Sequence, residues 1–130
     1  MITDFYIKIT PRPAPRPRLG KYGAYNESWY TAYKKELILK IKTSGLAKLD
    51  YSILYIQFGL PYPKTVKGGE KMRIEGAPHR NDNGDVDNFI KPVKDALQQS
   101  GLINNDCQFY LVCGEKTYTK SSGFIFFALG

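Results

Sequence analysis

The chain has 130 residues, of which 42% are hydrophobic, which is enough for one domain with a buried core and too apolar for a disordered chain. With 19 lysines and arginines against 12 aspartates and glutamates, the formal net charge of +7 favours polyanionic partners. No apolar run approaches the roughly 20 residues of a membrane span, and the N-terminus lacks the pattern of a signal peptide, so we expect a cytosolic protein.

The first 25 residues predict a strand followed by a basic arm. Residues 1–10 alternate, with Phe5, Ile7 and Ile9 on one side, as in a half-buried strand. The next ten residues hold four prolines and three arginines, which exclude regular helix or strand and keep the backbone extended. Because residues 11–25 contain no acid, we interpret them as a semi-rigid basic arm.

An amphipathic helix is predicted between Asn26, which suits an N-cap, and Gly45, which suits the position just after a helix. The apolar side chains that recur there at helical spacing are Tyr30, Tyr33, Leu37, Ile38 and Ile41. An alternative interpretation of Trp29 and the tyrosines is that they stack on nucleic-acid bases. Aromatic residues beside aliphatic ones on a helix are more typical of a core, which disfavours that role.

A second strand is predicted over residues 51–60, ended by Pro61-Tyr62-Pro63. Its side chains that face one way are Leu54, Ile56, Phe58 and Leu60. Residues 64–83 follow as a polar stretch with several lysines, arginines and glycines. About 20 residues without regular structure are unusual inside a domain and tend to be functional or disordered. We therefore expect a mobile basic loop that becomes ordered on a polyanion.

The last part of the chain predicts a helix and two strands. One face of the helix, Phe89–Gln99, carries Phe89, Val93, Ala96 and Leu97. Pro92 is tolerable only in a first turn, so the helix should begin close to 88–91. From residue 107 the pattern is that of strands, and we expect Cys107 and Cys113 to pack there as small hydrophobic side chains rather than in a disulfide or zinc site. The predicted order of elements is β-α-β-loop-α-β-β. This order predicts a single α+β (mixed α/β) domain with a small mixed sheet and two helices.

The basic residues are concentrated in the arm and the loop, whereas many of the acids lie in a different part of the sequence. A basic body with a local acidic cluster suits a metal-using nuclease, because cations bind the phosphate backbone and carboxylates bind the metal. An unevenly charged, solvated surface is the alternative on composition alone. The predicted DNA contacts are Arg16, Arg18, Lys64, Lys67, Lys71, Arg73 and Arg80.

The acids that carry the predicted chemistry are Asp85, Asp87 and Asp106. Asp85 and Asp87 project from one face if their segment is extended, and the six residues from Gly101 span up to about 20 Å, enough to bring Asp106 back along the helix. Three hard oxygen donors with open positions favour Mg²⁺ over zinc, with Mn²⁺ as the alternative ion. Lys91, four residues after Asp87, is placed to stabilise charge on a phosphate.

Structural roles for the same acids remain open. Asp87 sits where an N-cap would sit, and Asp106 follows two asparagines as a turn residue would. A calcium-binding loop over residues 81–85 is a further alternative, but it places Ile90 where the bidentate glutamate belongs, and it fails on that ground.

The whole pattern, rather than the acidic pair, resembles the RusA family of Holliday junction resolvases. That family shows Asp-x-Asp-Asn-x-x-Lys, then Asp-Ala-Leu, then an Asp at the start of a strand; the matching residues here are Asp85, Asp87, Asn88, Lys91, 95–97 and Asp106. Residues 15–18, Pro-Arg-Pro-Arg, are similar to phage-type members. Asn105 departs from the pattern, since many members have a second acid there.

The resemblance implies that Asp85, Asp87, Asp106 and Lys91 are catalytic, that Mg²⁺ is the cofactor, and that a homodimer nicks two strands of a four-way DNA junction in a bacterial or phage-infected bacterial cytosol. A non-catalytic DNA-binding module, whose acids only cap and turn, is the competing hypothesis. A nuclease that prefers forks or flaps is a third.

Overall fold

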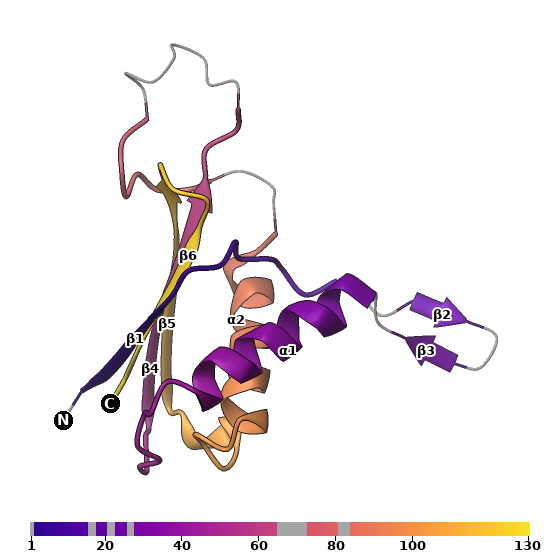
Figure 1. The fold of residues 1–130 in the computed structure, drawn as a ribbon, viewed down its shortest axis with the longest axis vertical. Helices are drawn as coiled ribbons and strands as arrows, with labels where there is room; N and C mark the ends of the chain where they lie inside the picture. The colour runs from indigo at the N-terminus through magenta and orange to yellow at the C-terminus, as the bar shows by residue number, and fades with distance from the viewer. Residues whose placement is uncertain (1, 16–17, 21–22, 26–27, 65–72, 81–83) are drawn as a thin grey trace.

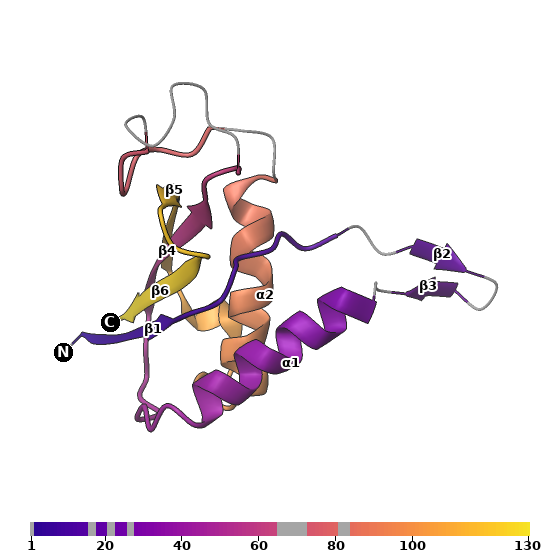
Figure 2. The ribbon, with the colours of Figure 1, turned by 45° about the horizontal axis from the view of Figure 1, so that its top comes forward.

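The computed structural model describes residues 2–15, 18–20, 23–25, 28–64, 73–80 and 84–130. A four-stranded sheet is covered on one face by two helices, α1 (Ser28–Lys42) and α2 (Val86–Gln99), as Figures 1 and 2 show. The strand order is β1 (Thr3–Ile7), β6 (Phe124–Leu129), β4 (Ile53–Pro61) and β5 (Leu111–Thr119). Only β4 and β5 run parallel, so the sheet is mixed. The predicted single α+β domain is confirmed.

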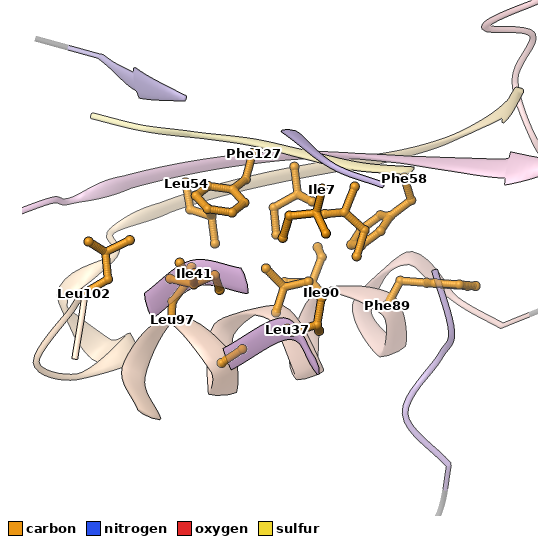
Figure 3. Close-up of a cluster of buried hydrophobic side chains, with 14 of the residues drawn as sticks. Ile7, Leu37, Ile41, Leu54, Phe58, Phe89, Ile90, Leu97, Leu102 and Phe127 are labelled. Carbon is orange, nitrogen blue, oxygen red and sulfur yellow. The ribbon is translucent and has the colours of Figure 1, made fainter. Parts of the chain in front are cut away.

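The core lies between the sheet and the helices. Alternate residues of β4 and β6 point into it, and in β4 these are the predicted Leu54, Ile56, Phe58 and Leu60. The apolar stripe of α1 and the predicted face of α2 pack against them (Figure 3). Period-two and period-3.6 patterns therefore identified the buried faces correctly. No helix within the described ranges is long and apolar enough to cross a bilayer.

The basic arm contains strand structure that the prolines were expected to exclude. Residues Arg18–Gly20 form β2 and pair antiparallel with β3 (Gly23–Tyr25) in a two-stranded ribbon that stands away from the body (Figures 1 and 2). The expectation fails because the last proline of the arm is Pro17, and every residue from 18 to 25 has a backbone N–H to donate.

Helix α2 begins at Val86, earlier than predicted, so Pro92 lies inside it rather than in its first turn. Pro92 has no N–H to donate to the carbonyl of Asn88, four residues earlier. The backbone N–H of Ala14 donates to that carbonyl instead, at 2.8 Å. A donor from outside the helix thus replaces the missing helical bond, which is why this proline does not set the start of the helix.

The segment after α2 also differs from the prediction. Residues Asp106–Gln108 form a short 3-10 helix, η2, and the strand begins only at Leu111. Cys107 and Cys113 are both free and exposed, so the expectation that they pack as hydrophobic residues is wrong. Packing of Cys113 would require the odd-numbered residues of β5 to face the core. At the start of β5 the even-numbered residues do so instead: Val112 is half-buried, and Leu111 is exposed.

The described part of the expected 64–83 loop includes residues 73–80, which lie along the outer edge of β5. Pro78 forms an antiparallel bridge with Thr117, and the N–H groups of Gly76 and His79 donate to the carbonyls of Tyr118 and Lys116. The ring of Tyr118 is stacked on Tyr62 and also packs against His79, with 4.4 Å between centroids in each pair. This stretch is therefore anchored to the sheet.

Candidate active site

A pocket of about 340 Å³ lies along α2, on the side where the helix faces η2 and β5. The residues that line it are Asp87, Ile90, Lys91, Lys94, Asp95, Asp106 and Val112. Three of the four predicted catalytic residues thus share one pocket, although Asp106 is 19 positions from Asp87 in the sequence.

Helix α2 presents its polar residues as one stripe. Asp87, Lys91 and Lys94 follow one another at spacings of four and three, so they project from the same side of the helix. The opposite side, which includes Phe89 and Val93, is buried. Close packing on β5 is possible because position 114 is glycine: a Cβ there would lie 2.6 Å from Ile90 Cδ1. The stripe is therefore held at the edge of the sheet.

Asp85, not Asp87, occupies the N-cap position of α2. Its backbone is extended, but its side chain makes no capping hydrogen bond. Asp87 lies within the first turn, so the two acids do not share one extended segment as predicted. Asp85 is exposed and is not among the residues that line the pocket. The structural alternative gave the capping role to Asp87, which lies inside the helix instead, and Asp85 at the cap position makes no side-chain capping bond.

The turn before Asp85 is fixed by contacts from two other parts of the chain. Gly84 has a φ of +120°, which favours glycine, and a Cβ there would lie 2.8 Å from Pro13 Cβ. Lys116 Nζ donates to the carbonyl of Gly84 at 2.7 Å. The start of the Asp85–Lys91 segment is therefore held by the arm on one side and by β5 on the other.

Asp106 is the first residue of η2, and its neighbour Asn105 does the capping. The Asn105 side chain accepts from the N–H of Cys107 at 2.9 Å, and the Gln108 side chain accepts from the N–H of Asn105. Asp106 thus lies in a turn, as the structural alternative expected, but the side-chain bond that caps this turn comes from Asn105. The Asp106 carboxylate is left to line the pocket, while its N–H donates to Gln98 Oε1 at 3.2 Å.

Lys94 and Gln98 were not among the predicted site residues, and Asp95 appeared there only as part of a motif. The spacing from Asp87 and Lys91 could have pointed to Lys94, because it continues their stripe. Gln98 carried no signal, since its role depends on where η2 packs. Asp95 is engaged by α1: Lys34 Nζ lies 3.7 Å from its carboxylate. Burial raises the pKa of Tyr30, and the nearby Asp95 charge adds to that rise.

The carboxylates suit a hard divalent cation but do not enclose one. Within the described part of the chain, no three His, Cys, Asp or Glu side chains are grouped closely enough to hold an ion. The lining residues from Asp87 to Asp95 extend over about 12 Å of helix, which explains this. Mg²⁺ commonly binds through one or two carboxylates and completes its shell with water and substrate phosphate. The donor set fits such an open site.

The structure describes four of the seven predicted DNA contacts. Arg18 opens β2, and Lys64 and Arg80 are exposed. Arg73 instead donates to the carbonyls of Pro63 and Lys64, at 3.3 and 3.1 Å, and so closes the base of its loop. The other three, Arg16, Lys67 and Lys71, lie outside the described residues. His79 is buried, with 6% of its surface exposed, which makes it a packing residue in this conformation.

Comparison with known proteins supports an assignment to a family. No curated protein matches the sequence significantly. A family model described as Endodeoxyribonuclease RusA matches residues 8–125. The matched stretch runs from the end of the first strand, through the arm and the pocket on α2, into β6. Because that stretch is most of the chain, this protein belongs to the RusA family of endodeoxyribonucleases.

Proposed function

We propose that this endodeoxyribonuclease is Mg²⁺-dependent and selective for branched DNA, and that it resolves four-way junctions by paired nicks. The observation that carries the proposal is the pocket shared by Asp87, Lys91 and Asp106. It places acids and a cation together on an open surface, where a phosphodiester can approach. The family assignment supplies the reaction class, hydrolysis within a DNA strand.

Asp85, Asp87 and Asp106 are the residues that would hold the metal. Bound there with water and a DNA phosphate, Mg²⁺ or Mn²⁺ would polarise the phosphodiester and lower the pKa of a water. Lys91 projects into the same pocket and stabilises negative charge that develops on the phosphate. Lys94, on the next turn of the stripe, adds a second cation for the DNA backbone.

The basic segments position the DNA. The residues proposed to contact phosphates are Arg16 and Arg18 from the arm and Lys64, Lys67, Lys71, Arg73 and Arg80 from the basic loop and its ends. Such contacts add affinity that is independent of sequence and falls with salt. The root of the arm lies beside α2, since the N–H of Ala14 donates to the carbonyl of Asn88, which supports a DNA path that passes both the arm and the acids.

We further propose that the active form is a homodimer. A four-way junction has near two-fold symmetry, and two nicks in one encounter need two active sites. Each chain supplies one set of Asp85, Asp87, Lys91 and Asp106, so a two-fold pair of chains is the simplest arrangement.

The test compares cleavage of a synthetic four-way junction with cleavage of a fork, a flap and a linear duplex of the same sequences. We expect two symmetric nicks in the junction in Mg²⁺, none in EDTA, and slower cleavage of the other DNAs. Faster cleavage of forks or flaps would make those the substrate. Binding without cleavage of any DNA in Mg²⁺ or Mn²⁺ would favour a DNA-binding module.

A further inference from the structure

A backbone hydrogen bond joins the root of the basic arm, residues 11–15, to helix α2. The backbone N–H of Ala14 donates to the carbonyl of Asn88 at 2.8 Å. Asn88 lies one residue after Asp87 and three before Lys91, so the bond is made in the turn that carries both side chains. In an uninterrupted helix that carbonyl would accept from residue 92. Proline at 92 leaves it for the arm.

A second contact fixes the same two segments to each other. Pro13 lies so close to Gly84 that a Cβ on Gly84 would be 2.8 Å from Pro13 Cβ. Gly84 directly precedes Asp85 and is itself held by Lys116 through its carbonyl. The arm therefore packs on the turn before α2 as well as on its first residues.

Helix α1 holds the root from the other side. The N–H of Arg12 donates to Tyr33 Oη at 3.2 Å, and the Arg12 guanidinium lies 4.1 Å above the Trp29 ring. Tyr33 is buried, and its burial raises the pKa of its hydroxyl to about 12, so that group stays protonated. Three consecutive residues, Arg12 to Ala14, are thus fixed to the body, and the chain that follows carries Arg16 and Arg18.

We propose that Pro92 is a positioning residue. Because Pro92 has no N–H, the Asn88 carbonyl is free to accept from Ala14, and this bond fixes the position of the arm relative to the pocket on α2. This inference rests on the proposed function. The arm contacts DNA a few residues beyond Ala14, and Asp87 and Lys91 act on DNA beside Asn88. The hydrogen bond from Ala14, together with the contacts of Pro13 and Arg12, therefore sets the spacing between the phosphate that is held and the phosphate that is cut.

A double-mutant cycle separates this role from a purely structural one. Ala14→Pro removes the donor and leaves the Asn88 carbonyl unsatisfied, which lowers the melting temperature. Pro92→Ala supplies a helical donor that competes with Ala14 for the Asn88 carbonyl. In the double variant the helix satisfies its own carbonyl, so the melting temperature returns toward that of the wild type while the bond between Ala14 and Asn88 stays broken. Ala14→Ser, which keeps the N–H, is the matched control.

The readout is the position and rate of the nicks in an end-labelled four-way junction. We expect the wild type and Ala14→Ser to cut at the same discrete positions. The double variant should cut at least about tenfold more slowly and at several neighbouring phosphodiesters, although it is stable and binds the junction in Ca²⁺. A double variant that cuts at the wild-type positions and rate would overturn the inference, because stability alone would then explain the single variants.

Hydrogen exchange at the Ala14 amide tests the coupling without any cleavage. That amide should be protected in the wild type and exchange faster in Pro92→Ala. Equal protection in both proteins would contradict the inference whatever the enzyme cuts. A wild type that cuts no branched DNA in Mg²⁺ or Mn²⁺, but shows the expected difference in exchange, would reject the proposed function and leave the link between arm and helix standing.

Discussion

The backbone N–H of Asp106 donates to Gln98 Oε1 at 3.2 Å, which ties the start of η2 to the last turn of α2. The two residues are separated by the end of the helix and a turn in which Gly101 has a φ of +84°. Because Asp106 lines the pocket from η2 while Asp87 and Lys91 line it from α2, this bond sets where one acid lies relative to the others.

Gln98→Ala should therefore lower the rate of cleavage with little effect on junction affinity. The net value of one such hydrogen bond, about 1 kcal/mol, corresponds to a loss of roughly five- to tenfold in kcat if the bond positions Asp106. Single-turnover cleavage in Mg²⁺ and binding in Ca²⁺ measure the two effects. Gln98→Glu keeps an acceptor oxygen at the same reach and is the control. Equal losses in both variants would point to charge or packing rather than to the bond.

The order of the elements and the buried faces could be predicted from the sequence because they depend on local periodicity. Leu54, Ile56 and Phe58 alternate, and Tyr33, Leu37 and Ile41 recur at helical spacing, so their burial follows from strand and helix geometry. Some of the features that were missed depend on contacts between distant segments. The start of α2 is one, because Pro92 is tolerated inside the helix only through Ala14, 78 positions away in the chain.

The same division holds for the candidate site. The Asp85–Lys91 motif and Asp106 were visible as a pattern, and the structure brings Asp87, Lys91 and Asp106 to one pocket. Which acid occupies the cap position was not predictable, since Asp85 and Asp87 are equally suitable residue types. Nor was the capping by Asn105, which depends on a reciprocal bond with Gln108 in a 3-10 turn that the strand-like pattern concealed.

Replacing Arg18, Lys64 and Arg80 together by alanine should weaken binding to every DNA tested and flatten its dependence on salt. Each phosphate contact that is lost should reduce the slope of log K against log salt concentration by about 0.9. Fluorescence anisotropy over a series of salt concentrations measures this. Replacing Lys35, Lys42 and Lys48, which are exposed on α1 and beyond its end, removes the same three charges and provides the control. If the control flattens the slope as much, the DNA-binding face lies elsewhere.

The protein should form a dimer in solution at the concentrations at which it makes paired nicks. Light scattering coupled to gel filtration gives the mass, and a supercoiled cruciform plasmid reports whether both nicks occur before release, because paired nicks linearise it and single nicks relax it. We expect twice the chain mass of 14.8 kDa and linear product. A monomeric mass together with linear product from single encounters would contradict the homodimer.

Acidification should destabilise the segment that carries His79. This side chain is buried against Tyr118, and burial, with Lys116 nearby, lowers its pKa from the ordinary value. The unfolded chain therefore takes up a proton first as the pH falls below about 6.5, so the stability that neutral His79 contributes is lost as the pH falls toward its lowered folded pKa. The melting temperature should fall between pH 7.5 and 5.5.

The matched variant for this effect is His79→Phe, which keeps a ring against Tyr118 and cannot be protonated. Its melting temperature should fall less over the same pH range. Hydrogen exchange in residues 73–80 should rise at pH 5.5 in the wild type and not in the variant, because those residues are held to β5 beside His79. Parallel pH profiles for the two proteins would show that other groups cause the decline.

Asp85→Asn, Asp87→Asn and Asp106→Asn distinguish the catalytic role of the acids from a structural one. Asparagine caps helices and forms turns about as well as aspartate, so a structural role would leave folding and cleavage nearly unchanged. If the acids hold Mg²⁺, each loss of charge should lower cleavage on the order of 100-fold or more, the scale on which a single electrostatic stabiliser of a transition state acts. Junction binding in Ca²⁺ or EDTA should persist or tighten, because a negative charge near phosphate has been removed.

Lys91→Ala tests the proposed role of the lysine. If Lys91 acts on the transition state, its replacement should reduce kcat more than junction affinity.

The three acids need not respond equally. Asp87 and Asp106 line the pocket and Asp85 does not, so Asp85→Asn is the variant that decides whether the cap position takes part in the reaction. Full cleavage by Asp85→Asn beside inactive Asp87→Asn and Asp106→Asn would confine the metal site to the pocket. Near wild-type cleavage by all three folded variants would reject the proposed metal ligands altogether.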